Sequence, residues 1–165
     1  MPWTNAKPEP PIGSYGVVRT WGLFGILIRI GTQHSMNHAF IYIGDGKIVQ
    51  AAPRKGVYVS EATDWPKAYY NRHEVLTDAQ RASIVANALS LVGRKYNFQG
   101  IFVMFLGCLG LKTKWAAKRL ERTARLFCSQ DVDQAYYLSG VHLFDDGRLF
   151  GQISPGDLAD RIMDL

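Results

Sequence analysis

Residues 37–52, NHAFIYIGDGKIVQAA, decide the fold of this 165-residue chain. Two segments rich in β-branched and aromatic residues flank residues 44–46 (GDG), which is typical of a β-hairpin. If the loop has three residues and its last glycine adopts the left-handed conformation of a G1 bulge, Phe40 faces Gln50. His38 and Gln50 are then diagonal neighbours on one face, about 7–8 Å apart at Cα. A two-residue Asp-Gly loop would shift the register by one residue and put them on opposite faces.

Further strands and helices are expected on both sides of this hairpin. The apolar run 20–30 predicts a buried helix that ends near Gly31. Residues 56–60 (GVYVS) predict a third strand, and residues 72–76 (RHEVL) predict a fourth. Later helices are expected in four places: 97–110, 115–127, 128–139, and a short helix with Ser154 as its cap and Pro155 in its first turn.

The helix expected after Thr77 has the clearest boundary signals. Thr77 and Gln80 can form a capping box at its start, and Gly93 fits the position that follows its end. Four apolar residues recur at helical spacing, namely Ala82, Val85, Leu89 and Val92. The order of a helix, antiparallel strands and then several helices predicts an α+β fold rather than alternating βαβ units.

Length and composition indicate one globular domain. Hydrophobic residues make up 47% and charged residues 20% of the chain, which is an ordinary globular balance. We expect an N-terminal arm over residues 1–16 and a single domain over residues 17–165. The net charge of +5 favours anionic partners. Nucleic acid is not expected among them, because no nucleic-acid-binding motif accompanies the charge.

The apolar stretches of the chain indicate whether the protein is secreted or spans a membrane. The N-terminus lacks the apolar segment of a secretory signal, and the runs 21–30 and 101–111 are each too short to span a bilayer. We therefore expect a cytoplasmic protein at synthesis, which would reach a cell wall or a virion by another route. The region 101–125 joins an apolar run to a basic amphipathic helix, so it could lie on an anionic membrane surface; the alternative is a solvated helix face.

Cys128 is the candidate nucleophile. It stands at the start of the helix expected over residues 128–139, where free backbone N–H groups and the helix dipole would lower the pKa of its thiol. The same N–H groups could bind an oxyanion. The alternative is a small buried hydrophobic residue, which is the usual role of a free cysteine. Cys108 forms no C-x-x-C pair with it, so neither zinc nor redox chemistry is indicated.

His38 is the candidate base, and Gln50 is the candidate residue that orients its ring. The alternatives are a histidine that fills the end of a sheet and a polar residue on a sheet face. His34 and His38 are four residues apart, a metal spacing only if both lie on one helix. Because His38 begins a strand, no metal is expected, and the proposed chemistry needs no other cofactor.

Residues 37–60 (NHAFIYIGDGKIVQAAPRKGVYVS) and 125–140 (RLFCSQDVDQAYYLSG) resemble, in this order, the circularly permuted branch of the NlpC-type papain-like cysteine hydrolases. The resemblance implies a papain-like fold with an antiparallel sheet packed against helices. It also implies Cys128 as nucleophile, His38 as base and Gln50 as the orienting residue. Permuted members often carry an acid at the third position. The glutamine here can still orient the imidazole, but it would stabilise an imidazolium less.

The resemblance further implies a reaction and two weaker site assignments. Tyr96, in GRKYNF (93–98), and Ser129 would line the site or support the oxyanion; a tyrosine of the core is the alternative for Tyr96. The implied reaction is hydrolysis of an amide bond in a peptide or wall peptide through an acyl-enzyme, in a wall-remodelling or phage protein. Two alternatives stay open: a lipid ester or thioester acyl hydrolase or acyltransferase, and a catalytically silent binding or virion protein of the same fold.

Overall fold

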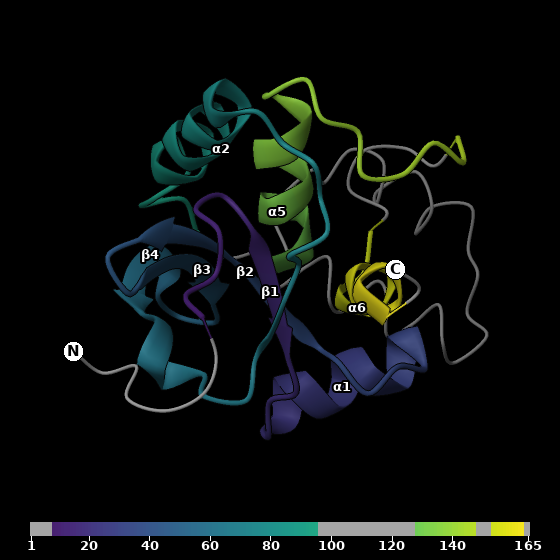
Figure 1. Ribbon diagram of the computed structural model, residues 1–165. Coiled ribbons are helices and arrows are strands. Elements are labelled where there is room, and N and C mark those ends of the chain that lie inside the picture. The colour runs from purple at the N-terminus through teal and green to yellow at the C-terminus, as the bar shows by residue number, and fades with distance from the viewer. Residues whose placement is uncertain (1–7, 96–127, 148–152, 164–165) are drawn as a thin grey trace.

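The computed structural model describes residues 8–95, 128–147 and 153–163. Tyr96, Cys108, and the expected helices and membrane surface between residues 97 and 127 lie outside the described residues. Within the described part, five strands form one sheet in the order β4-β3-β2-β1-β5, and neighbouring strands are antiparallel (Figure 1). The strands are β1 (Tyr15–Val18), β2 (His38–Gly44), β3 (Lys47–Ala52), β4 (Gly56–Glu61) and β5 (Tyr69–Tyr70).

Helices accompany this sheet, as expected for the α+β class. They are α1 (Leu23–Thr32), α2 (Asp78–Ser90), α5 (Cys128–Tyr137) and α6 (Pro155–Met163), with a short 3-10 helix at Ala62–Asp64. Of these, α2, α5 and α6 contact the strands of the sheet. Helices α2 and α5 lie side by side, whereas α1 lies at the other end of the molecule (Figure 1). No helix among the described residues combines the length and the apolar character that crossing a bilayer requires.

The alternation of side chains along the strands divides the core in two. Ala39 and Ile41 of β2 face the main core, which α2, α5 and α6 complete. Phe40 and Tyr42 point to the opposite face, where a smaller aromatic cluster includes Trp65. Both faces of β2 are therefore buried, which explains why its sequence is apolar at nearly every position.

The β2–β3 hairpin has the expected register but not the expected loop. Phe40 pairs with Gln50, as predicted. The loop, however, has only two residues, Asp45–Gly46, with φ angles of 50° and 69°, which is the left-handed pair that a type I′ turn requires. A β-bulge at Ile43 interrupts the pairing and cancels the one-residue shift that this loop would cause. His38 and Gln50 consequently lie on the same face of the sheet.

The start of α2 is confirmed, but the buried face of the helix differs from the prediction. Thr77 and Gln80 form the capping box in both directions. The buried stripe consists of Ile84, Ala88 and Leu91, whereas Leu89 and Val92 of the expected stripe are exposed. Both stripes have helical spacing, and the contact of α2 with α5 selects between them.

Two other predictions concern the strand after β4 and the last helix. Residues 72–76 do not form the expected strand. The pairing with β1 involves only Tyr69–Tyr70, because the Asn71 side chain then accepts hydrogen bonds from the N–H groups of His73 and Glu74 and turns the chain. The cap of α6 is confirmed, since the Ser154 hydroxyl accepts a hydrogen bond from the N–H of Asp157 at 3.1 Å.

The N-terminal region contributes more to the fold than the expected arm over residues 1–16. Strand β1 begins at Tyr15, whose side chain is fully buried. Just before it, the N–H of Gly13 donates to the carbonyl of Tyr42 at 2.8 Å. The domain therefore starts before residue 17, because the sheet needs β1 to connect β2 with β5.

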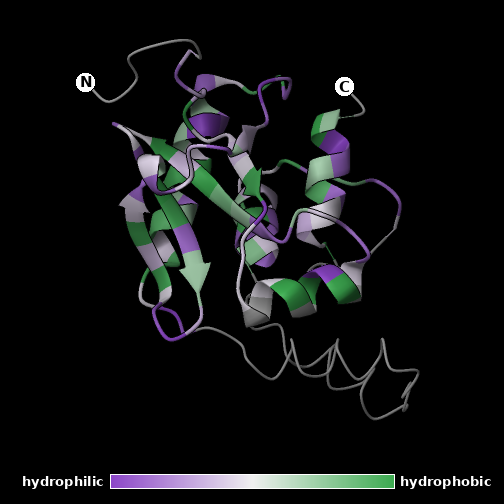
Figure 2. Ribbon diagram, turned by 90° about the horizontal axis from the view of Figure 1, so that it is seen from below, coloured by the Kyte–Doolittle hydropathy of each residue, from purple (hydrophilic) through white to green (hydrophobic). Residues whose placement is uncertain are grey.

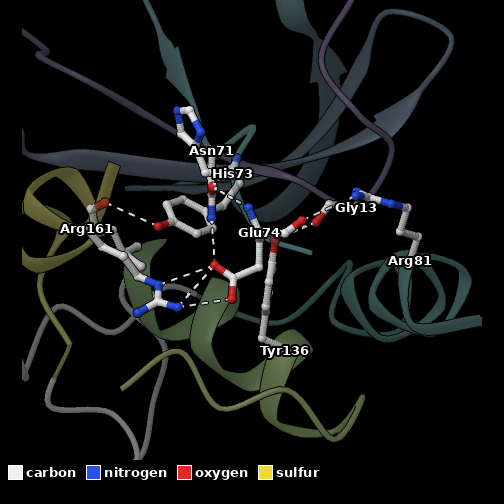
Figure 3. A network of polar contacts seen from close by, with 9 residues as sticks. Gly13, Asn71, His73, Glu74, Arg81, Tyr136 and Arg161 are labelled. Atoms are coloured by element: carbon white, nitrogen blue, oxygen red, sulfur yellow. Dashed lines mark hydrogen bonds and ion pairs between the residues drawn. The ribbon is translucent and has the colours of Figure 1, made fainter. Parts of the chain in front are cut away.

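A polar network around Glu74 joins α6 to the rest of the domain (Figure 3). The Glu74 carboxylate accepts hydrogen bonds from Arg161 of α6, at 3.0 Å, and from Asn71, at 3.2 Å. Nearby, Arg81 of α2 donates to the Glu74 carbonyl, and the Tyr136 hydroxyl donates to the carbonyl of Gly13. Segments that are far apart in the sequence thus share one set of hydrogen bonds.

Replacing Glu74 by alanine is expected to lower the free energy of unfolding by about 2 kcal/mol, because it leaves Arg161 and Asn71 without their acceptor. The loss should be smaller than for a fully buried pair, since Arg161 is partly exposed and water can hydrate it. Urea unfolding at pH 7 measures the change. Asp160→Ala is the matched control: its mostly exposed carboxylate contacts His34 and should contribute less than about 1 kcal/mol. Equal losses in both variants would contradict the prediction.

Candidate active site

A pocket of about 150 Å³ lies where β2 begins and β3 ends. The sequence candidates His38, Gln50 and Cys128 all line it, although they come from three different elements. The remaining lining is mostly uncharged and apolar: Thr20, Gly25, Ile28, Asn37, Ala51, Ala52, Pro53, Tyr58 and Trp65.

The pocket forms at the end of the sheet, where side chains from its two faces can meet. Cys128 is the first residue of α5 and belongs to the main core. His38 is the first residue of β2 and contacts Phe40 and Trp65 on the opposite side. The two residues thus pack on opposite faces of the sheet but line the same pocket. Among the described residues, the hydrogen-bond partner of the His38 ring is Gln50 rather than Cys128.

The His38 ring is held by a chain of hydrogen bonds. Its Nε2 lies 2.7 Å from Gln50 Oε1. The same oxygen accepts the indole N–H of Trp65 at 3.0 Å, and Gln50 Nε2 donates to the Ser60 hydroxyl at 2.6 Å. An indole nitrogen can only donate, so it fixes which end of the Gln50 amide is the oxygen.

This orientation of Gln50 determines the tautomer of His38. Because the amide oxygen is an acceptor, the ring nitrogen that faces it must carry the proton. Nδ1 of the neutral ring is then an acceptor. His38 is thus prepared to take a proton at Nδ1 while Gln50 holds Nε2–H.

Burial keeps His38 neutral. Desolvation lowers the pKa of His38 below its ordinary value of 6.5, and the hydrogen bond to Gln50 opposes this shift only in part. A glutamine carries no charge, so it cannot offset the burial as a carboxylate would. At neutral pH the ring is therefore an uncharged base.

The thiol of Cys128 does not have the low pKa expected from its place at a helix start. Its side chain is only 2% exposed, and burial raises the pKa of the thiol to about 11. The backbone N–H groups of Ala39, Ser129 and Cys128 act in the opposite direction, but their effect is smaller. The sequence-based expectation is wrong on this point because desolvation outweighs the helix terminus. The resting pair is a neutral thiol and a neutral imidazole.

Alkylation of the resting protein should therefore be slow at Cys128. A pKa of about 11 leaves roughly one thiol in a thousand ionised at pH 8, so iodoacetamide should label Cys128 about 100-fold more slowly than it labels the urea-unfolded chain. Intact mass against time, in a Cys108→Ala background, measures the rate. Labelling that is fast and independent of pH below 8 would contradict the prediction and indicate a preformed ion pair.

Sequence reasoning missed the residues that position these candidates. Trp65 and Ser60 hold Gln50, and no local pattern marks them because both are distant in the sequence. Asn37 is buried, donates to the carbonyls of Thr20 and Gly25, and accepts the N–H of Thr20 at 2.7 Å. It thereby fixes α1 against the start of β2, and its place directly before His38 is the signal that could have identified it.

The two weaker candidates for the site are Ser129 and Tyr96. The Ser129 hydroxyl is buried and donates to the carbonyl of Ile153 at 2.6 Å, so it supports the chain near α6 and does not line the pocket. Tyr96 lies outside the described residues. The described residues include no group of three or more His, Cys, Asp or Glu side chains that could hold a metal ion.

Asp131, one turn after Cys128 on α5, was also missed. Both of its carboxyl oxygens are buried and have no hydrogen-bond partner among the residues that the structure describes. Burial raises the pKa of Asp131 to about 7, although the charge of Arg94 opposes this shift. An ionised Asp131 in turn raises the pKa of the Cys128 thiol. A titratable group with a pKa near neutral thus lies next to the candidate nucleophile.

Comparison of the chain with models of protein families and with curated proteins found no match.

Proposed function

We propose that this protein is a cysteine hydrolase with a permuted papain-like fold, in which Cys128 is the nucleophile and His38 the general base. The observation that carries the proposal is the fixed tautomer of His38. Gln50 holds Nε2–H and is itself oriented by Trp65, so Nδ1 is the available acceptor in a pocket that Cys128 also lines.

In the first step, Cys128 Sγ attacks the carbonyl carbon of the substrate while His38 Nδ1 takes the thiol proton. Because both groups rest in their neutral forms, proton transfer accompanies the attack rather than preceding it. The backbone N–H groups at the start of α5 stabilise the tetrahedral oxyanion. The carbon–nitrogen bond then breaks, and His38 gives the proton to the departing amine.

In the second step, water cleaves the thioester formed on Cys128. His38 Nδ1 takes a proton from the attacking water, and the hydroxide oxygen forms the new bond to the acyl carbon. The bond from that carbon to Sγ breaks, and the thiolate takes back the proton from His38. Gln50 keeps the ring oriented through both steps without changing its own protonation. The sequence of steps uses no metal and no organic cofactor.

The proposed substrate is an amide bond in a cell-wall peptide. The runner-up is a lipid ester or thioester, and the mostly apolar lining of the pocket favours it. A catalytically silent binding protein is the third candidate, and the raised pKa of the Cys128 thiol favours that reading.

The deciding experiment incubates the protein with purified wall, with phospholipid and with an acyl thioester. It follows released peptide, fatty acid or thiol, and it searches for an acyl adduct on Cys128 by intact mass. Release of wall peptides by the wild type but not by Cys128→Ala supports the proposal, and Cys108→Ala is the matched cysteine control. Release of fatty acid alone would identify the lipid-directed hydrolase. No release and no adduct from any substrate would support the silent protein instead.

Replacing Trp65 by phenylalanine should weaken catalysis without removing the base. The variant keeps a ring beside His38 but loses the N–H that fixes the Gln50 amide. The loss of this hydrogen bond should raise the activation free energy by about 1 kcal/mol, which corresponds to a kcat about five-fold lower. Nitrogen-15 NMR of the imidazole should show a smaller share of the Nε2–H tautomer. An unchanged tautomer ratio would contradict the role of Trp65, whatever happens to stability.

A further inference from the structure

Two large apolar side chains of α1 are exposed, although a buried helix was expected here. Ile26 and Ile30 are 41% and 56% exposed, and they are four residues apart, so they share one face. Ile28 is buried on the opposite side and lines the pocket. Figure 2 shows most of the α1 ribbon in the colour of hydrophobic residues. Exposed apolar side chains that gather on one face of a helix are the kind of feature that interaction surfaces are built from.

Trp21 stands just before α1 and extends this surface. It is 76% exposed, and two guanidinium groups lie over its ring, that of Arg19 at 4.3 Å and that of Arg29 at 5.0 Å from the ring centre. Neither arginine makes an ion pair with a described residue. An exposed tryptophan that contacts two cations is therefore close in sequence to the exposed Ile26 and Ile30.

The charged side chains within this segment of the chain are all cationic. Residues 10–44 contain no aspartate or glutamate, so Arg19 and Arg29 have no acidic residue near them in the sequence. An exposed tryptophan, exposed aliphatic side chains and arginines, on α1 and the residues just before it, match the chemistry of a membrane interface. The apolar groups enter the acyl boundary, the indole lies at the level of the headgroups, and the cations bind anionic phosphates. A partner protein would need an acidic and an apolar patch in the same arrangement.

We propose that Trp21, Arg19 and the outer face of α1 dock on the surface of an anionic lipid bilayer. The same helix supplies one wall of the pocket through Gly25 and Ile28, and Asn37 fixes it to the strand that carries His38. Docking therefore holds the pocket close to the membrane surface, where membrane-attached substrates are concentrated. This inference is independent of the reaction proposed above.

The test is co-sedimentation of the full chain with vesicles of phosphatidylcholine, with and without phosphatidylglycerol. The Cys128→Ala background is used so that hydrolysis cannot alter the lipid, and a failure of the proposed reaction leaves the result unaffected. We expect binding to the vesicles that contain phosphatidylglycerol. Arg19→Gln and Arg29→Gln should each weaken it about five-fold, and Trp21→Ala should weaken it about ten-fold or more.

Matched controls separate this surface from general charge and hydrophobicity. Lys47→Gln and Lys67→Gln remove exposed cations elsewhere, and Val75→Ser removes a side chain that is 97% exposed on a distant loop. These variants should keep most of the binding. Thermal melts by circular dichroism check that all variants fold.

Three results would overturn the proposal. One is an absence of binding to anionic vesicles. Another is binding that survives Trp21→Ala and the arginine variants but is lost when the basic residues of 112–125 are replaced. The last is a concentration-dependent dimer, seen by sedimentation velocity, that Trp21→Ala dissolves while vesicle binding stays unchanged, because the surface would then join two copies of the chain.

Discussion

His38→Ala is expected to lower kcat by about 1,000-fold, and Cys128→Ala by about 10,000-fold or more, with any substrate that the wild type cleaves. The reason is that the Cys128 thiol has a raised pKa and is protonated at rest, so it needs a base during the attack. Removing a general base of this kind typically costs 100- to 10,000-fold. Removing the nucleophile leaves only what the oxyanion site and substrate binding supply.

The dependence of kcat/KM on pH provides a second readout of the same pair. Because burial lowers the pKa of His38, the acidic limb of the profile should lie below pH 6.5. Gln50→Glu is the informative control, since an ionised carboxylate would raise the pKa of His38 and move this limb to higher pH. Steady-state kinetics from pH 4 to pH 9 would show both effects. If the acidic limb of the Gln50→Glu profile stays at the wild-type pH, the hydrogen bond between His38 and residue 50 is contradicted.

Asp131→Asn is expected to stabilise the protein by about 4 kcal/mol above pH 7. Burial raises the pKa of Asp131 from 3.8 to about 7 in the folded state, and this difference corresponds to about 4 kcal/mol. Between these pH values the folded state holds a proton that the unfolded state has released. The contribution of Asp131 to the free energy of unfolding is therefore most favourable below pH 3.8, and it is lost as the pH rises to 7. Asparagine does not titrate at this position, so the variant keeps its free energy of unfolding over this pH range.

Urea unfolding of both proteins across this pH range tests the prediction. The free energies of unfolding should be nearly equal near pH 3 and should diverge until pH 7, while the acid sensitivity caused by His38 is common to both proteins and cancels. Asp64→Asn, at an exposed position, is the matched control and should change the free energy of unfolding by less than about 0.5 kcal/mol. A constant difference between Asp131→Asn and the wild type at all pH values would mean that Asp131 does not titrate as its burial requires.

The same substitution should also act on Cys128. An ionised Asp131 raises the pKa of the thiol, so its removal should speed alkylation of Cys128 above pH 7 but not below pH 5, where Asp131 is protonated. This readout separates an electrostatic effect on the nucleophile from a general change in stability.

The sequence by itself determined the local features of this protein. The hairpin, the capping box at Thr77 and the cap at Ser154 follow from neighbouring residues, because turns and caps are closed by hydrogen bonds over three or four positions. The α+β class followed from the order of the elements. The pairing of Phe40 with Gln50 was predicted from a loop that does not exist, and it holds only because Ile43 is bulged.

Tertiary structure alone decided which side chains meet and how strongly water is excluded from them. Trp65 orients Gln50 across the smaller core, and this fixes the tautomer of His38. Burial reversed the expected shift in the pKa of Cys128, and it left the Asp131 carboxyl group without a hydrogen-bond partner in the described part of the chain. The pKa of a thiol depends on desolvation by residues from distant parts of the chain, and no local pattern encodes the sum of those contacts. Distant contacts also decide which side chains are buried. The apolar composition of α1 predicted a buried helix, but the packing of the folded chain leaves Ile26 and Ile30 exposed.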